Sequence, residues 1–198
     1  LGIPKLAPHA NPRHVIQVGY IIMAGALAIM AFSVTINGSN AFGVYLGAFV
    51  AGVGAGTVSS HSSNVVALAV SERDASQSGG IQSTMRNVGQ AIGVALLGAV
   101  LLLGITGQIR AGAAADPAVS PAVSEQGAQM GINPGSNQEF REQISDIDMS
   151  DSERTALVNI EARARYESTR AAYGVGAAII LLGLLTTPAI KTFEKREG

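Results

Sequence analysis

Two groups of polar residues interrupt apolar stretches, and they are the residues of this sequence best suited to bind a solute. The run SSHSSN places hydroxyl, imidazole and amide groups side by side, and MRNVGQ places a guanidinium beside two amides. Such side chains are costly in hydrocarbon, so within a membrane they face protein or water. The candidates for a substrate cavity are Ser59, His61, Ser63, Asn64, Arg86, Asn87 and Gln90.

A second interpretation of the same residues requires no ligand. All seven lie near the end of an expected helix, where polar side chains reach the lipid headgroups or cap the helix. The sequence leaves open whether they line a water-filled vestibule or only mark the membrane surface. No Asp or Glu lies within any expected span, so a carboxylate proton relay cannot be located in this chain.

No residue pattern indicates an enzyme. The chain has no cysteine, its three histidines lie in unlike surroundings, and no carboxylate stands near His61, which argues against a metal site or a catalytic triad. The net charge of −1 does not indicate a nucleic-acid partner. The stretch GVGAGT could approach a phosphate, but it lacks the preceding strand that such a loop needs. We therefore expect no catalytic residue, no metal and no cofactor.

The composition indicates a membrane protein. Hydrophobic residues make up 47% of the 198 residues, charged residues make up 14%, and the mean hydropathy is +0.32. A helix needs about 20 apolar residues to cross the hydrocarbon layer. We expect an all-α polytopic membrane protein with four transmembrane helices and one long extracytoplasmic loop. The expected order is a cytoplasmic segment 1–14, a span 15–36, a span 41–70 with a cytoplasmic extension, a cytoplasmic link 71–83, a span 84–105, the extracytoplasmic loop 106–170, a span 171–190 and a cytoplasmic tail 191–198.

The long loop is expected to be partly helical. Three prolines predict irregular structure at 116–136. A helical pattern begins at Asn137, and Ser150 or Ser152 is a candidate N-cap for a helix that continues into the last span. Because the loop has few large apolar residues, we expect an acidic cap without a core of its own.

The distribution of lysine and arginine predicts the orientation. All three lysines lie in the two terminal segments, on the same side as Arg73 and Arg86, whereas the six arginines of the long loop are diluted by ten acidic residues. The positive-inside rule then places both termini and the link in the cytoplasm. The chain begins at Leu1 without a signal peptide pattern, and we expect it to be part of a longer protein located in the cytoplasmic membrane.

Glycines four residues apart predict close helix packing. In lipid, such glycines let a neighbouring backbone approach, which adds dispersion contacts that lipid does not supply. The second and third spans are therefore expected to pack tightly against other helices, and the first and fourth to face lipid. The glycines concerned are Gly43, Gly47, Gly52, Gly56, Gly89 and Gly93.

The order of these features resembles the C-terminal end of major facilitator superfamily transporters. A glycine-rich helix with a polar patch, the link ASQSGG, the helix MRNVGQAIGVALLGAV, an outer loop and a last helix follow one another as in the fourteen-span drug/proton antiporter branch (EmrB/QacA type). Asn87 stands where that branch commonly has glutamine. The residues that carry the resemblance are Ser78, Gly79, Arg86, Gly89, Gly93, Ala95 and Gly98.

This resemblance implies the last four of fourteen spans, with the second and third lining a central cavity. It implies export of amphiphilic drugs or similar small molecules, driven by protons that flow inward. The implied partners are membrane lipid, the missing N-terminal transporter helices, the small-molecule substrate and protons. The acidic residues that carry coupling in such proteins lie mostly in earlier helices.

Two functions of other classes stay open. The chain could be a non-transporting four-span membrane anchor or accessory subunit that acts through its outer loop. A soluble enzyme with a glycine-rich loop would instead require the chain to partition into water without detergent, which we do not expect.

Overall fold

The structure of this chain, a computed structural model, describes residues 11–36, 38–71, 73–129 and 137–189. Within these ranges the chain is almost entirely helical, and four of its helices are long and apolar enough to cross a membrane. The predicted fold class, an all-α polytopic membrane protein, is confirmed. The predicted tail 191–198, most of the segment 1–14 and the loop residues 130–136 lie outside the described residues, as do Lys5, Lys191 and Lys195.

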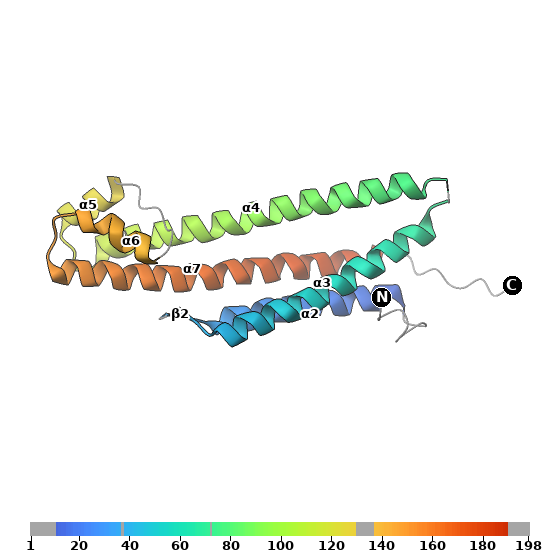
Figure 1. Cartoon of the computed structure of the whole chain (residues 1–198), viewed down its shortest axis with the longest axis horizontal. Coiled ribbons are helices and arrows are strands. Elements are labelled where there is room, and N and C mark those ends of the chain that lie inside the picture. Colours follow the sequence, from blue (N-terminus) through green and yellow to red (C-terminus); the bar gives the residue numbers. More distant parts are fainter. Residues whose placement is uncertain (1–10, 37, 72, 130–136, 190–198) are drawn as a thin grey trace. The chain divides into compact units, whose positions relative to one another are not determined.

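Four long helices contain the predicted spans (Figure 1). They are α2 (Pro12–Ser33), α3 (Ala41–Ala69), α4 (Ala75–Ala115) and α7 (Asp151–Thr186). A short hairpin of β1 (Val34–Thr35) and β2 (Gly38–Ser39) joins α2 to α3. Gly38 has a φ of 139°, a conformation that only glycine adopts readily. The remaining elements are α5 (Pro121–Gln129), α6 (Asn137–Gln143), η1 (Ile144–Asp146) and η2 (Thr187–Ala189).

Helix α4 is longer at both ends than the predicted span 84–105. It begins at Ala75, inside the predicted link 71–83, and it continues to Ala115 in the predicted loop. Asp74 explains the early start, because its carbonyl oxygen accepts from the Ser78 N–H at 2.9 Å and its carboxylate stands just before the first turn, where a negative charge is favoured. The glycines at 79 and 80 do not prevent the helix from forming.

The predicted loop 106–170 contains more helix than its prolines indicate. The expectation of irregular structure at 116–136 is wrong over Pro121–Gln129, where Ser120 precedes α5 and Pro121 takes the first helical position. The helix expected from Asn137 is observed as α6. The helix α7 runs unbroken from Asp151 into the last apolar stretch, as predicted.

The described chain separates into two compact units. The first contains α2, α3, residues 75–94 of α4 and the end of α7 from Tyr173. The second contains the β1–β2 hairpin, the rest of α4, the helices α5 and α6, and α7 up to Ala172. Each unit is held together by a different kind of packing.

The helices α2 and α3 of the first unit run antiparallel along their length. A Cβ added to Gly19 would lie 3.2 Å from the Gly54 carbonyl oxygen, and one added to Gly54 would lie 2.9 Å from the Gly19 carbonyl oxygen. A Cβ on Gly47 would meet the Ala26 carbonyl oxygen at 3.1 Å. The two backbones are thus in direct contact, which only small residues permit.

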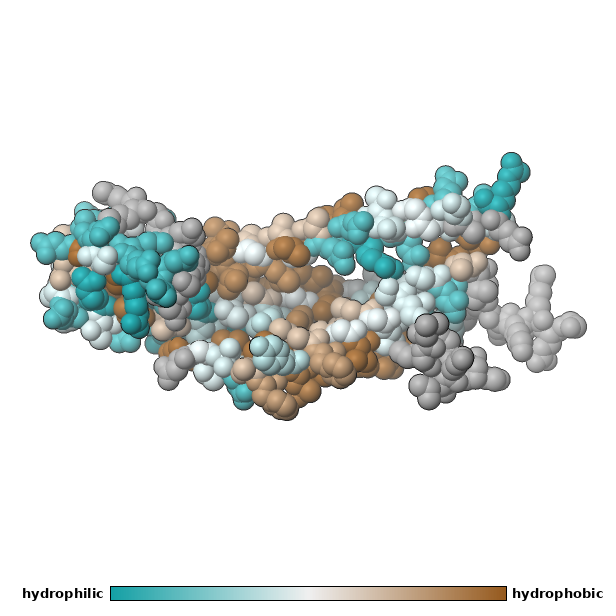
Figure 2. Space-filling view, in the orientation of Figure 1, coloured by the Kyte–Doolittle hydropathy of each residue, from teal (hydrophilic) through white to brown (hydrophobic). Residues whose placement is uncertain are grey.

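Outside this contact, the first unit shows large apolar side chains on its surface. Phe42, Tyr45 and Phe49 follow one face of α3 and are each more than two thirds exposed. In Figure 2, hydrophobic residues form a patch over the middle of the α2–α3 pair. Such a surface is suited to hydrocarbon, which agrees with a multi-pass membrane protein.

The second unit has an apolar core of its own. The ends of α4 and α7 and the short elements between them enclose ten buried residues, of which Phe140 is the largest and is 1% exposed. The expectation of a loop without a core is therefore wrong, because apolar residues spread along 106–170 meet in one buried cluster, which Ile105 joins from the preceding apolar part of α4. The buried set is Ile105, Ile109, Ala113, Val119, Val123, Phe140, Ile144, Ile147, Leu157 and Ala164.

One carboxylate joins the beginnings of two helices in the second unit. Ser150 is the N-cap of α7, since its hydroxyl accepts from the Glu153 N–H at 3.3 Å and its own N–H donates to Glu153 Oε2 at 2.8 Å. Glu153 Oε1 also accepts from the N–H of Ser120, before α5, at 3.1 Å. The hydroxyls and then the N–H groups of Ser120 and Ser150 lower the pKa of Glu153 from 4.5 to about 2.

We predict that Gly54→Ala loosens the α2–α3 pair and that Gly52→Ala does not. The new Cβ at residue 54 would lie 2.6 Å from Met23 Cγ as well as against the Gly19 carbonyl, whereas at residue 52 it would meet no atom within 4 Å among the described residues. We expect Gly54→Ala to lower the free energy of unfolding by about 1–3 kcal/mol. Circular dichroism during titration of mixed micelles with sodium dodecyl sulfate measures this difference. An equal loss of stability in both variants would contradict the contact.

We also predict that acid releases the beginning of α5 from α7. The pKa of Glu153 is lowered in the folded protein, so its contribution to stability is complete above pH about 4.5 and disappears as the pH falls toward 2. Amide hydrogen exchange should show lower protection factors at residues 120–124 at pH 3 than at pH 6. Glu153→Gln should remove this pH dependence, and the control Glu125→Gln should retain it.

Candidate functional site

The predicted polar residues of α3 and α4 all belong to the first unit. Four of them lie in the second half of α3 and three lie in the first half of α4. The packing of α3 on α2 decides which of the α3 residues are buried.

His61 is on the buried side of α3, with only 9% of its surface exposed. Its Nδ1 lies 3.1 Å from the carbonyl oxygen of Thr57, one turn earlier. Because a carbonyl oxygen only accepts, Nδ1 carries the hydrogen, and Nε2 is the nitrogen available for a further interaction. Thr57 is also buried and donates to the Val53 carbonyl oxygen at 2.8 Å, so its hydroxyl is satisfied within the helix.

A hydrogen bond joins the polar groups of α3 and α4. The Gln82 amide nitrogen donates to Ser63 Oγ at 3.3 Å. The sequence prediction did not include Gln82, although it lies one helical turn before Arg86 and carries the same kind of amide as Gln90. An i, i+4 spacing of polar residues on α4 is the signal that could have identified it.

The remaining candidates are more accessible. Ser59 is partly buried and Asn64 is exposed on α3. Arg86, Asn87 and Gln90 are exposed on α4, and no hydrogen bond or ion pair joins any of their side chains to another described residue. The structure therefore brings Ser63 to α4 but does not gather the seven residues into a closed pocket.

The six predicted packing glycines fall into two groups. Gly43 and Gly47 lie against Ser33 and against Met30 of α2, respectively. At the other four, an added Cβ would meet no atom of the described residues within 4 Å, so their packing stays a prediction. These four are Gly52, Gly56, Gly89 and Gly93.

Two glycines of the α2–α3 contact were missed by the sequence prediction. Gly19 and Gly54 make the reciprocal backbone contact. Neither has another glycine four residues before or after it in the sequence. Their signal is a spacing of seven residues, seen in Gly19, Ala26 and Ser33 on α2 and continued on α3 by Gly47 and Gly54. A repeat of seven is typical of helices that pack at a shallow angle along their length.

The described residues offer little to a metal ion. No group of three or more His, Cys, Asp or Glu side chains that could hold one occurs in this part of the chain. The polar surface on α4 instead presents neutral amides and one guanidinium, which can donate hydrogen bonds to a solute or to a neighbouring helix.

Cysteine labelling can distinguish a water-filled vestibule from a membrane-surface position. The chain has no natural cysteine, so Gln90→Cys and Ile92→Cys can be made directly, and both positions are exposed on α4. If Gln90 faces water, a charged maleimide should label Gln90→Cys in liposomes about tenfold faster than Ile92→Cys, because only the hydrated thiol ionises readily. Similar slow rates at both positions would favour the membrane-surface interpretation.

Comparison of the chain with protein-family profiles, with curated proteins and with solved structures found no match. The resemblance at residues 78–98 therefore rests on those residues alone. Four apolar helices with small-residue contacts between them place this chain among multi-pass membrane proteins.

Proposed function

We propose that this chain is the C-terminal four-span portion of a proton-coupled efflux transporter for amphiphilic drugs or other small molecules. The proposal rests on the first half of α4, residues 75–94. There Arg86, Asn87 and Gln90 are exposed on a membrane helix, and their side chains have no partner among the described residues. A guanidinium near the hydrocarbon costs a few kcal/mol when it has no polar neighbour. This surface therefore requires water or further protein.

The open glycines support the same conclusion. On α4, Gly89 and Gly93 flank Gln90, and on α3, Gly52 and Gly56 lie away from α2; none of the four is covered by described residues. In a membrane such positions favour close approach of another helix. Additional helices of a larger transporter are the natural partners, in keeping with the resemblance to the fourteen-span drug/proton antiporter branch of the major facilitator superfamily.

The proposal includes an orientation in the cytoplasmic membrane. Both termini and the α3–α4 link lie in the cytoplasm, and the loop 106–170 lies outside. The polar ends of α3 and α4 then line the cytoplasmic mouth of the cavity, where the exposed side chains of Asn64 and Arg86 meet solute or water. The coupling carboxylates lie in other helices of the transporter, since the four apolar spans carry none.

A second function is favoured by one observation. The second unit encloses an apolar core that includes Phe140 and Ile144, so it has the means to keep a defined shape. A non-transporting membrane anchor or accessory subunit that acts through this unit is therefore the alternative.

Transport assays test the proposal directly. The chain should be expressed together with the coding sequence that precedes Leu1, and export of ethidium should be followed in inverted vesicles. We expect Arg86→Ala to reduce export about tenfold or more, Arg86→Lys to retain part of it, and Arg73→Ala, which removes an arginine from the α3–α4 link, to leave it unchanged. Normal export by Arg86→Ala at normal expression would refute a direct role for this residue. A start codon near Leu1 and the absence of export would favour the accessory subunit.

A further inference from the structure

The second unit contains a groove between α4 and α7 that the proposed transport path does not use. Its volume is about 570 Å³, within the range of about 300–1,000 Å³ that small-molecule sites occupy. Gly112 and Ile160 form its base, where a Cβ on the glycine would lie 2.7 Å from Ile160 Cγ2. Ala115 and Ala164 extend the apolar surface on either side.

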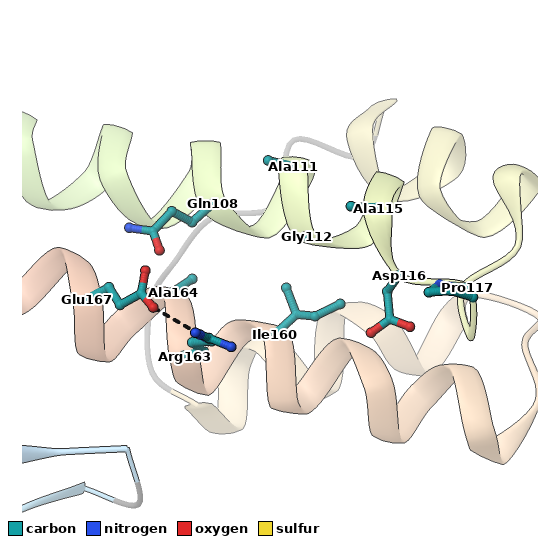
Figure 3. Close-up of a pocket in the computed structure, with 10 residues that line it drawn as sticks. All are labelled: Gln108, Ala111, Gly112, Ala115, Asp116, Pro117, Ile160, Arg163, Ala164 and Glu167. Carbon is teal, nitrogen blue, oxygen red and sulfur yellow. Dashed lines mark hydrogen bonds and ion pairs between the residues drawn. The ribbon is translucent and has the colours of Figure 1, made fainter.

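Of the charged side chains that line the groove, Arg163 and Glu167 form an ion pair and Asp116 does not (Figure 3). Glu167 accepts from Arg163 at 2.9 Å, so these two charges largely cancel. Asp116 points from the end of α4 toward α7 and has no ion-pair partner among the described residues. One of its oxygens accepts from the N–H of Ala118 at 2.9 Å, which fixes the carboxylate at the rim of the groove. The groove therefore carries one uncompensated negative charge.

The position of Asp116 strengthens the preference for a cation. Asp116 directly follows the last residue of α4, and a helix carries a partial negative charge at its C-terminal end. The last turn of α4 contains no basic residue to offset this charge. A carboxylate is unfavourable at this position, and a bound cation would relieve both the carboxylate and the helix end.

The remaining features favour an organic cation over a metal ion. Calcium takes six to eight oxygen ligands, whereas the groove offers one unpaired carboxylate and one that is already paired. Its base is apolar, so it can contact hydrocarbon or aromatic groups. Gln108 is held by a hydrogen bond of 3.0 Å from its amide nitrogen to Ser168 Oγ, which leaves the amide oxygen as an additional acceptor.

We propose that this groove binds monovalent amphiphilic organic cations, with Asp116 as the counter-ion and the Gly112–Ile160 surface as the apolar contact. The groove lies within the second unit, and the polar residues of the proposed transport path lie in the first. Binding here can therefore be measured whether or not the chain takes part in transport, so the two proposals can fail separately.

The test measures binding of tetraphenylphosphonium to the full chain in a non-ionic detergent by equilibrium dialysis, with protein-free micelles as the blank. Asp116→Asn should weaken binding about fivefold, as expected for the loss of one partly exposed charge pair. Asparagine keeps an oxygen for the Ala118 N–H, so the turn should be retained. Arg163→Gln frees Glu167 and should tighten binding by a similar factor.

Two controls make the result specific. Asp148→Asn removes an exposed carboxylate that does not line the groove and should leave binding unchanged. Triphenylphosphine oxide, which is neutral, should bind equally to the wild type and to Asp116→Asn. The proposal is overturned if Asp116→Asn binds the cation as the wild type does, if Asp148→Asn causes the same loss, or if Arg163→Gln weakens binding.

Discussion

The contact between the Gly19 and Gly54 backbones is the constraint on which the first unit depends. In water, two helices associate because apolar side chains leave the solvent, but in hydrocarbon that driving force between helices is absent. Dispersion contacts must replace it, and each one is worth only about 0.1–0.2 kcal/mol at optimal separation. Many such contacts require the backbones to touch, which explains why small residues follow the α2–α3 seam. The same seam buries Thr57 and His61 and so determines which polar groups of α3 stay accessible.

The sequence was sufficient to predict the four membrane helices, because their apolar length is a property of each segment alone. It was less informative about where α4 begins. The glycines at 79 and 80 disfavour a helix, whereas α4 begins before them, directly after Asp74. It also did not reveal the core of the second unit. That core depends on residues such as Ile105 and Phe140 that are far apart in the chain, and segment composition does not show that they meet.

For the candidate site, spacing predicted some contacts and hid others. Of the glycines four apart, Gly43 and Gly47 lie against α2. The same spacing occurs at Gly89 and Gly93, but a Cβ added to either would meet no described residue within 4 Å. A helix face can thus be recognised from its sequence, but its partner cannot, because the partner is specified by another segment. The bond from Gln82 to Ser63 is of this kind.

Different parts of the described chain follow the rules of two solvents, and α4 and α7 take part in both. In the first unit, hydroxyls such as those of Ser33 and Thr57 donate to carbonyl oxygens within their own helices, as a medium without water requires. Between Arg110 and Arg170, Ser150 and Glu153 cap α7, acidic residues are frequent, and large apolar side chains such as Phe140 are buried, as in water. The change from the apolar environment to the aqueous one occurs along α4 between its apolar part and Arg110, and along α7 near Arg170. An unpaired carboxylate such as Asp116 is tolerable only on the aqueous side of that change, because hydration offsets the unfavourable end of the helix there. A groove with an apolar base and a charged rim therefore belongs where the chain passes from one solvent to the other, and that location is what allows it to hold an amphiphile.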